Sequence, residues 1–107
     1  MSLELTASEL QLVRQILATW VPDRVVWVFG SRATGNAKKY SDLDLAILGE
    51  TPLSLAQLAD LAEAFSLSDL PFRVDLVDWS QANEAIKANI HRQHQVIWPL
   101  EPLTPAE

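Results

Sequence analysis

The sequence predicts a single α/β domain in which helices cover a small mixed sheet. Short apolar runs typical of strands alternate with longer segments of helical period. Their order is helix, strand, short helix, strand, helix, strand, helix, which fits a layered α/β arrangement. The 107 residues suffice for one domain with a modest core, and no internal repeat or linker divides the chain.

The first helix is predicted to open at the capping box Thr6–Glu9 and to end before Pro22. Its apolar residues recur at helical spacing, and they are Leu10, Val13, Ile16, Leu17 and Trp20. A β-branched and aromatic run over residues 25–29 then predicts a buried strand. We expect a short helix to follow this strand and to be interrupted at Gly35.

The second half of the chain repeats this alternation. Residues 42–48 read as the second strand, and Ser54 is expected to cap a helix that reaches about Ser66. The buried stripe of that helix is predicted to comprise Leu55, Leu58, Ala59, Ala62 and Phe65. Residues 72–78 alternate as a third strand.

A last helix and a short strand complete the predicted order. Ser80 can cap this helix, which is expected to run through about Arg92 and to turn four apolar residues inward. These residues are Ala82, Ala85, Ile86 and Ile90. Residues 96–98 are expected to form the short strand.

Composition excludes several classes of protein. The net charge of −6 argues against binding a long nucleic acid, because such binding depends on Lys and Arg contacts to phosphates. The absence of cysteine excludes disulfides and thiolate sites. No apolar run approaches a membrane span and no signal peptide is visible, so we expect a cytoplasmic protein that does not enter membranes.

The stretch from Gly30 to Leu48 carries the chemistry. Asp42 and Asp44 alternate on a predicted strand, so their carboxylates point to the same face, where they repel each other unless a cation lies between them. Mg²⁺ is the natural cation, because it prefers carboxylate oxygens and keeps water and phosphate in its shell. Gly30 permits a close approach of the backbone to a ligand, and the N–H groups after it can face phosphate. The stretch therefore predicts a site for a metal–nucleotide complex.

The pattern Gly-Ser, ten residues, Asp-x-Asp resembles the signature of the DNA polymerase beta-like nucleotidyltransferase superfamily. Residues 30–33 and 41–46 are similar to the minimal nucleotidyltransferases, which are commonly antitoxins paired with HEPN-domain partners. The resemblance implies a single nucleotidyltransferase domain over residues 1–98, and the Pro-rich residues 99–107 are expected to form a flexible tail.

The resemblance also implies roles for particular residues. Asp42, Asp44 and Asp75 would be the catalytic residues and the ligands of two Mg²⁺ ions, and Asp75 would also serve as general base. Asp78 is a rival third carboxylate, but it falls on the opposite face of a regular strand from Asp75. The residues expected to bind the nucleotide are Gly30, Ser31, Arg32, Lys38 and Lys39.

Thr34 and the connector lysines limit these assignments. Many relatives carry a second Arg where this chain has Thr34, so one positive charge near the phosphates is missing. The lysines of the connector have an equally good interpretation as solvated surface residues. His91 and His94 are assigned no role, and the tryptophans Trp27, Trp79 and Trp98 are interpreted as core or interface residues.

The implied activity is Mg²⁺-dependent transfer of AMP from ATP to a side-chain hydroxyl of a cognate HEPN-type toxin. An alternative is an antitoxin that neutralises its partner by binding alone, with a weak or vestigial nucleotide site. A third is transfer to a small molecule by an oligomer of the chain. The acceptor could be held by the partner or by the protein's own dimer, so homo-oligomers and hetero-oligomers both stay open.

Overall fold

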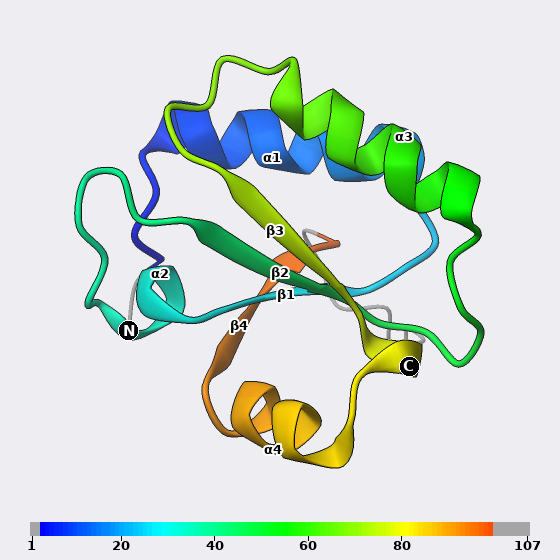
Figure 1. The fold of residues 1–107 in the computed structure, drawn as a ribbon. Helices are drawn as coiled ribbons and strands as arrows, with labels where there is room; N and C mark the ends of the chain where they lie inside the picture. Colours follow the sequence, from blue (N-terminus) through cyan, green and yellow to red (C-terminus); the bar gives the residue numbers. More distant parts are fainter. Residues whose placement is uncertain (1–2, 100–107) are drawn as a thin grey trace, which may run out of the picture.

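Four strands form one mixed sheet in the order β3-β2-β1-β4 in the computed structural model, which describes residues 3–99 (Figure 1). Two long helices, a short helix and a C-terminal helix accompany the sheet. The elements are α1 (Ala7–Trp20), β1 (Val26–Phe29), α2 (Ser31–Thr34), β2 (Leu43–Ile47), α3 (Leu55–Ser66), β3 (Val74–Asp78), the 3₁₀ turn η1 (Trp79–Gln81), α4 (Glu84–Arg92) and β4 (His94–Trp98). The predicted α/β class and element order are confirmed.

The direction of the strands explains how distant segments meet. β1 pairs antiparallel with both β2 and β4, whereas β2 and β3 run parallel. The parallel pair is connected through α3, as a parallel connection requires a crossover. β3 and β4 are the outer strands, so the catalytic candidates of β2 lie in the interior of the sheet.

The hydrophobic core lies between the sheet and the layer formed by α1 and α3, which lie together above the sheet in Figure 1. Alternate residues of β1 and β2 point into this core, as period-2 patterning requires. The fully buried side chains include Val13, Leu17, Val26, Val28, Leu43, Leu45, Ile47, Leu61 and Ile97. The other side chains of β1 and β2 therefore face the side on which α4 lies.

The caps of α1 and α3 are as predicted. Thr6 and Glu9 form a reciprocal capping box on α1, and Ser54 and Gln57 form another on α3. Each box satisfies two backbone N–H groups that a helix start otherwise leaves without partners.

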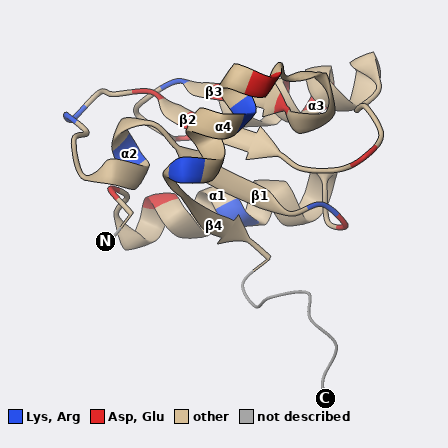
Figure 2. Ribbon diagram, turned by 90° about the horizontal axis from the view of Figure 1, so that it is seen from below, with Lys and Arg blue, Asp and Glu red and all other residues tan. Residues whose placement is uncertain are grey.

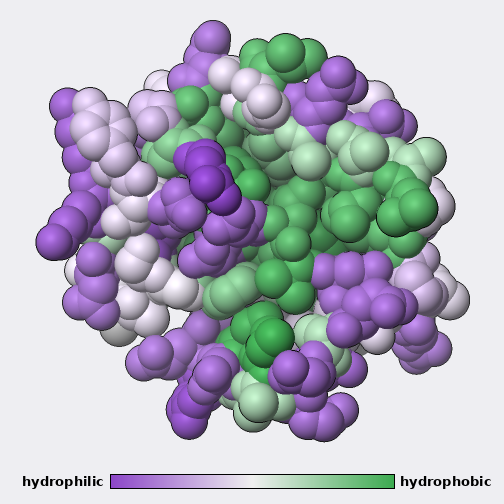
Figure 3. Space-filling view, viewed as in Figure 1, coloured by the Kyte–Doolittle hydropathy of each residue, from purple (hydrophilic) through white to green (hydrophobic). Residues whose placement is uncertain are grey.

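The predicted buried stripe of α3 is wrong in part. Leu61 and Phe65 are buried and Leu58 is half-buried, but Leu55, Ala59 and Ala62 are exposed, Leu55 to 87%. The helix is apolar on more than one side, so its period alone does not identify the side that meets the sheet. Hydrophobic side chains accordingly gather in the centre and on the right of the face drawn in Figure 3.

The predicted start of the last helix is also wrong. Asp78 accepts hydrogen bonds from the Ser80 backbone and hydroxyl, and the chain makes the 3₁₀ turn η1 before the helix. Asn83 then caps α4. The competing local hydrogen bond to Asp78 uses the groups of Ser80 that would otherwise cap a helix.

α4 packs on the second face of the sheet through fewer apolar residues than expected. Ile90 is buried, but Ala85 and Ile86 are exposed. Aromatic contacts join β1 to β4 and η1: the Trp27 ring stacks on His94 at 3.7 Å between centroids and meets Trp79 edge-on at 5.4 Å. These contacts support the interpretation of Trp27 and Trp79 as packing residues.

Within residues 3–99, the longest helix is α1 with 14 residues, and no helix is long and apolar enough to cross a membrane. The division into a domain over residues 1–98 and a tail over residues 99–107 stays a prediction, because residues 100–107 lie outside the part of the chain that the structure describes.

Candidate functional site

Gly30 forms the corner between β1 and α2 and contacts the central carboxylate. Its φ of 74° and ψ of −157° lie in a region that only glycine adopts readily. A Cβ atom built on Gly30 would collide with Oδ2 of Asp44. The glycine is therefore required twice, by its backbone conformation and by the close approach of Asp44.

The sheet register brings the predicted carboxylates together. Asp44 lies opposite Asp75 in the parallel pair β2–β3 and opposite Phe29 in the antiparallel pair β1–β2. Asp42 precedes β2 by one residue and lies two residues from Asp44. Burial and the negative charges of Asp75 and Asp42 raise the pKa of Asp44 from 3.8 to about 6. The three acidic groups thus influence one another, as a cation-binding cluster requires.

The Asp75 side chain is engaged with a cation of the protein itself. Arg73, two residues earlier on β3, donates from Nη2 to Oδ1 of Asp75 at 3.3 Å, and both side chains are solvent-exposed. Within residues 3–99, no three Asp, Glu or His side chains lie close enough together to hold a metal ion. The register places the three acidic residues next to one another, while the Asp75 carboxylate is paired with Arg73 in this structure.

Asp78, the rival third carboxylate, has a structural role. One of its oxygens accepts the Leu53 backbone N–H at 2.9 Å, and the other accepts the Ser80 backbone N–H and hydroxyl. It lies opposite Ile47, at the far end of β2 from Asp44. Its carboxylate is thus occupied in joining β3 to the segment before α3.

The expectation that Arg32 binds the triphosphate does not fit the structure. Its side chain is only 5% exposed, and its guanidinium donates to the backbone carbonyls of Glu4, Lys38, Lys39 and Ser41. The ring of Phe72 lies 4.0 Å from its central carbon. Arg32 therefore holds the connector before β2 in place through these hydrogen bonds. The planar guanidinium can donate to four carbonyls, which the single ammonium group of a lysine could not do.

The two connector lysines face another surface. Lys38 and Lys39 line a depression together with Glu4, Arg32 and Pro71, and this depression does not include Gly30 or Ser31. Their side chains are exposed. The prediction that they bind nucleotide is neither supported by this placement nor tested by a bound ligand, and it stays a prediction.

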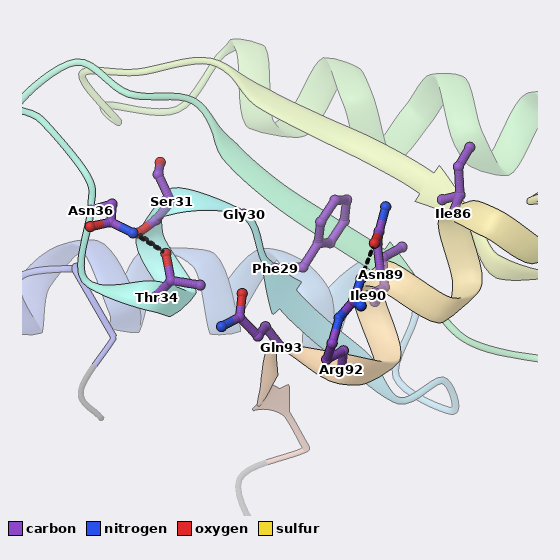
Figure 4. Close-up of a pocket in the computed structure, with 10 residues that line it drawn as sticks. All are labelled: Phe29, Gly30, Ser31, Thr34, Asn36, Ile86, Asn89, Ile90, Arg92 and Gln93. Carbon is purple, nitrogen blue, oxygen red and sulfur yellow. Dashed lines mark hydrogen bonds between the residues drawn. The ribbon is translucent and has the colours of Figure 1, made fainter.

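A pocket of about 550 Å³ lies beside Gly30 and Ser31, between α2 and the last turns of α4 (Figure 4). Its size is typical of small-molecule sites. The lining residues are Phe29, Gly30, Ser31, Thr34, Asn36, Ile86, Asn89, Ile90, Arg92 and Gln93. Sequence reasoning identified Gly30 and Ser31 but missed the contribution of α4.

The α4 residues carry no local motif that could have revealed them. Asn89, Arg92 and Gln93 lie about sixty residues beyond Ser31 in sequence and reach the pocket only because β4 returns beside β1. The basic last turn of α4 is the one available signal, and cations are common there for reasons of helix stability alone.

The sequence matches the family described as Polymerase beta, Nucleotidyltransferase over residues 11–101. It is also 52% identical over 95 residues to a Haemophilus influenzae protein named "Probable protein adenylyltransferase MntA". That match covers 89% of this chain and 83% of the relative.

Solved structures of toxin–antitoxin complexes have the same fold. One, a toxin–antitoxin with AMP-PNP, matches with a TM-score of 0.71 at 27% identity, over 83% of this chain and 72% of that one. Another contains a tri-AMPylated Shewanella oneidensis HEPN toxin with its MNT antitoxin, with a TM-score of 0.60 at 26% identity, over 83% of this chain and 71% of that one. By the family match over residues 11–101 and the 52% identical relative, the chain belongs to the polymerase beta nucleotidyltransferase family.

Proposed function

We propose that this protein is a Mg²⁺-dependent antitoxin that transfers AMP from ATP to a hydroxyl side chain of a cognate HEPN-type toxin. The observation that carries the proposal is the placement of Asp44 opposite Asp75 on parallel strands, with Gly30 against Asp44. The 52% identical relative named as a protein adenylyltransferase and the AMPylated toxin in a similar complex support the same activity.

Asp42, Asp44 and Asp75 would hold the metal. Their oxygens are the hard ligands that Mg²⁺ prefers. Burial first, and then the charges of Asp75 and Asp42, raise the pKa of Asp44 to about 6, and a divalent cation would relieve the charge repulsion. Bound there, Mg²⁺ would supply charge neutralisation at the phosphates and a lower pKa for the acceptor hydroxyl.

The chain's own groups would position the reactants. Gly30 and Ser31 line the pocket at the start of α2, and their backbone N–H groups would suit a phosphate of ATP. The acceptor oxygen forms a bond to the α-phosphorus while the bond from that phosphorus to pyrophosphate breaks, and the hydroxyl proton passes to the Asp75 carboxylate. Asp75 is suited to this role because it lies on the outer strand β3, where an acceptor can approach.

The test is the intact mass of the cognate toxin after incubation with the antitoxin, ATP and Mg²⁺. We expect mass increases of one or more AMP groups on the toxin. The matched control carries Asp42→Asn and Asp44→Asn, which preserve side-chain shape but remove the charge, and it should leave the toxin unmodified. An unmodified toxin that forms a stable complex with both proteins would contradict the proposal and identify an antitoxin that acts by binding alone.

A further inference from the structure

The pocket beside Gly30 needs a source of positive charge. Apart from Arg92, its lining contains hydroxyls, carboxamides and apolar side chains, and a nucleotide placed there would bring several negative charges. Mg²⁺ at the carboxylates could balance only part of them. A protein of net charge −6 also provides little general attraction for an anion. A cation in the pocket would therefore have a large effect on nucleotide affinity.

Most of the eight Lys and Arg side chains are committed elsewhere. Arg14 donates to the Ile97 carbonyl, Arg24 to the Leu48 carbonyl and Arg32 to four carbonyls, while Arg73 pairs with Asp75 and Lys87 lies over the Trp79 ring. Lys38 and Lys39 line a different depression. Only Arg92 both lines the pocket beside Gly30 and carries a positive charge.

Arg92 has the freedom that a phosphate ligand needs. It ends α4, its side chain is exposed, and within residues 3–99 it makes no ion pair. Nη2 of its guanidinium contacts the Asn89 side-chain oxygen one turn earlier, which directs the group along the pocket wall (Figure 4). The Lys and Arg residues of α4 are drawn blue in the view of Figure 2. Across the pocket stand Ser31 and Thr34.

We infer that Arg92 binds a phosphate of the nucleotide. The inference rests on the proposed function, since it takes the pocket as the ATP site. The planar guanidinium donates two parallel hydrogen bonds to a phosphate and keeps its charge at all relevant pH values. Arg92 thereby provides from α4 the positive charge that Thr34 does not provide from α2. Ser31 and Thr34 lie on one side of the pocket and Arg92 on the other (Figure 4).

The test is binding of AMP-PNP in the presence of Mg²⁺, measured by calorimetry for the wild type and three variants. Arg92→Gln should weaken binding about 10-fold or more, the effect of losing a charged hydrogen bond. Arg92→Lys should fall between the two, because it keeps the charge but not the fork. Lys87→Gln removes the same charge from the same helix outside the pocket and should bind as the wild type does. Thermal unfolding of each free variant checks that folding is unchanged.

The outcomes separate the inference from the proposed function. If the wild type binds AMP-PNP and Arg92→Gln binds it equally well, Arg92 does not contact phosphate and the inference is wrong, while the proposed function stands. An equal loss in Arg92→Gln and Lys87→Gln would also overturn it, since that loss would follow from overall charge. If the wild type does not bind AMP-PNP, the proposed function and the inference both fail.

Discussion

Asp44 is held in an environment that disfavours its charged form. Burial, followed by the charges of Asp75 and Asp42, raises its pKa to about 6. The folded protein therefore keeps this proton to higher pH than the unfolded chain, which loses it near 3.8. Folding stability from this group is greatest below about pH 4, falls as the pH rises to about 6, and stays lower above that.

Asp44→Asn should stabilise the metal-free protein at pH 7.5, because the amide has the shape of the acid without its charge. The gain is expected to be on the order of 1 kcal/mol after allowance for solvent screening, and it should shrink toward zero near pH 4. Urea unfolding of both proteins in chelator, at pH 4 and pH 7.5, measures it. A wild type that is the more stable protein at pH 7.5 would contradict this account of the carboxylate cluster.

Gly30→Ala should destabilise the protein by about 2 kcal/mol, since a non-glycine backbone is strained at this φ and ψ. AMP transfer should also be lost, because the new Cβ displaces the Asp44 carboxylate. Gly35→Ala is the matched control: Gly35 has a φ of 84° at the end of α2 and should cost about 1 kcal/mol. If Gly30→Ala still transfers AMP at a temperature at which it is folded, the close contact between Gly30 and Asp44 is not needed for activity, and this prediction is wrong.

At the level of elements, α2 and the connector after it depend on one buried cation. Arg32 joins the carbonyls of residues 38, 39 and 41 to that of Glu4, and the Glu4 N–H donates in return to the Arg32 carbonyl at 2.9 Å. The N-terminal segment, the start of α2 and the approach to β2 are thereby held as one unit. Since the connector leads into β2, this unit also fixes the position at which the strand that carries Asp44 starts.

Arg32→Met should destabilise the protein by about 3 kcal/mol, because it keeps the packing volume but leaves buried carbonyls without donors. Amide hydrogen exchange should accelerate over residues 36–41 more than in the core strands. Chemical denaturation and exchange followed by mass spectrometry provide the two measurements. Arg14→Met, which removes a single bond to the Ile97 carbonyl, is the comparison and should cost less. Equal costs would show that the connector does not depend on Arg32.

At the level of the whole molecule, binding of metal and nucleotide should stabilise the folded state, because both ligands would bind the folded protein in preference to the unfolded chain. Under the proposed function, Mg²⁺ would bind the folded carboxylates and not the unfolded chain, so saturating Mg²⁺ with AMP-PNP should raise the melting temperature of the wild type. A free ligand concentration one hundred times the dissociation constant increases the free energy of unfolding by about 2.7 kcal/mol. Thermal unfolding with and without the ligands measures this shift, and Asp42→Asn with Asp44→Asn should show little of it. An equal shift in that variant would place the metal elsewhere.

The sequence predicted the elements whose signals are local. The strand leading to Gly30, the capping boxes at Thr6 and Ser54, and the alternation of Asp42 and Asp44 each depend on neighbours within a few residues. The pairing of Asp44 with Asp75 agrees with the resemblance, and the register supports it. The catalytic assignment of the three carboxylates stays a prediction.

The sequence could not predict features that arise from packing. Arg32 looks like a phosphate ligand by its position after Gly-Ser, and only the folded connector shows that carbonyls occupy it. Leu55 follows the helical period of the core yet is exposed, because α3 meets the sheet through Leu61 and Phe65. Arg92 reaches the pocket through the return of β4, which no local pattern describes.

β3 is an edge strand of the sheet. Under the proposed function, this position separates activation of the nucleotide from selection of the acceptor hydroxyl. The carboxylates of β2 are fixed by neighbours on both sides, but Asp75 stands on a strand that pairs only with β2. If Asp75 is the proton acceptor, as proposed, the partner that docks along this edge of the sheet sets which hydroxyl reaches it. Under the proposed function, the range of acceptors could therefore diverge through changes at the docking surface while the chemistry of nucleotide activation stayed constant.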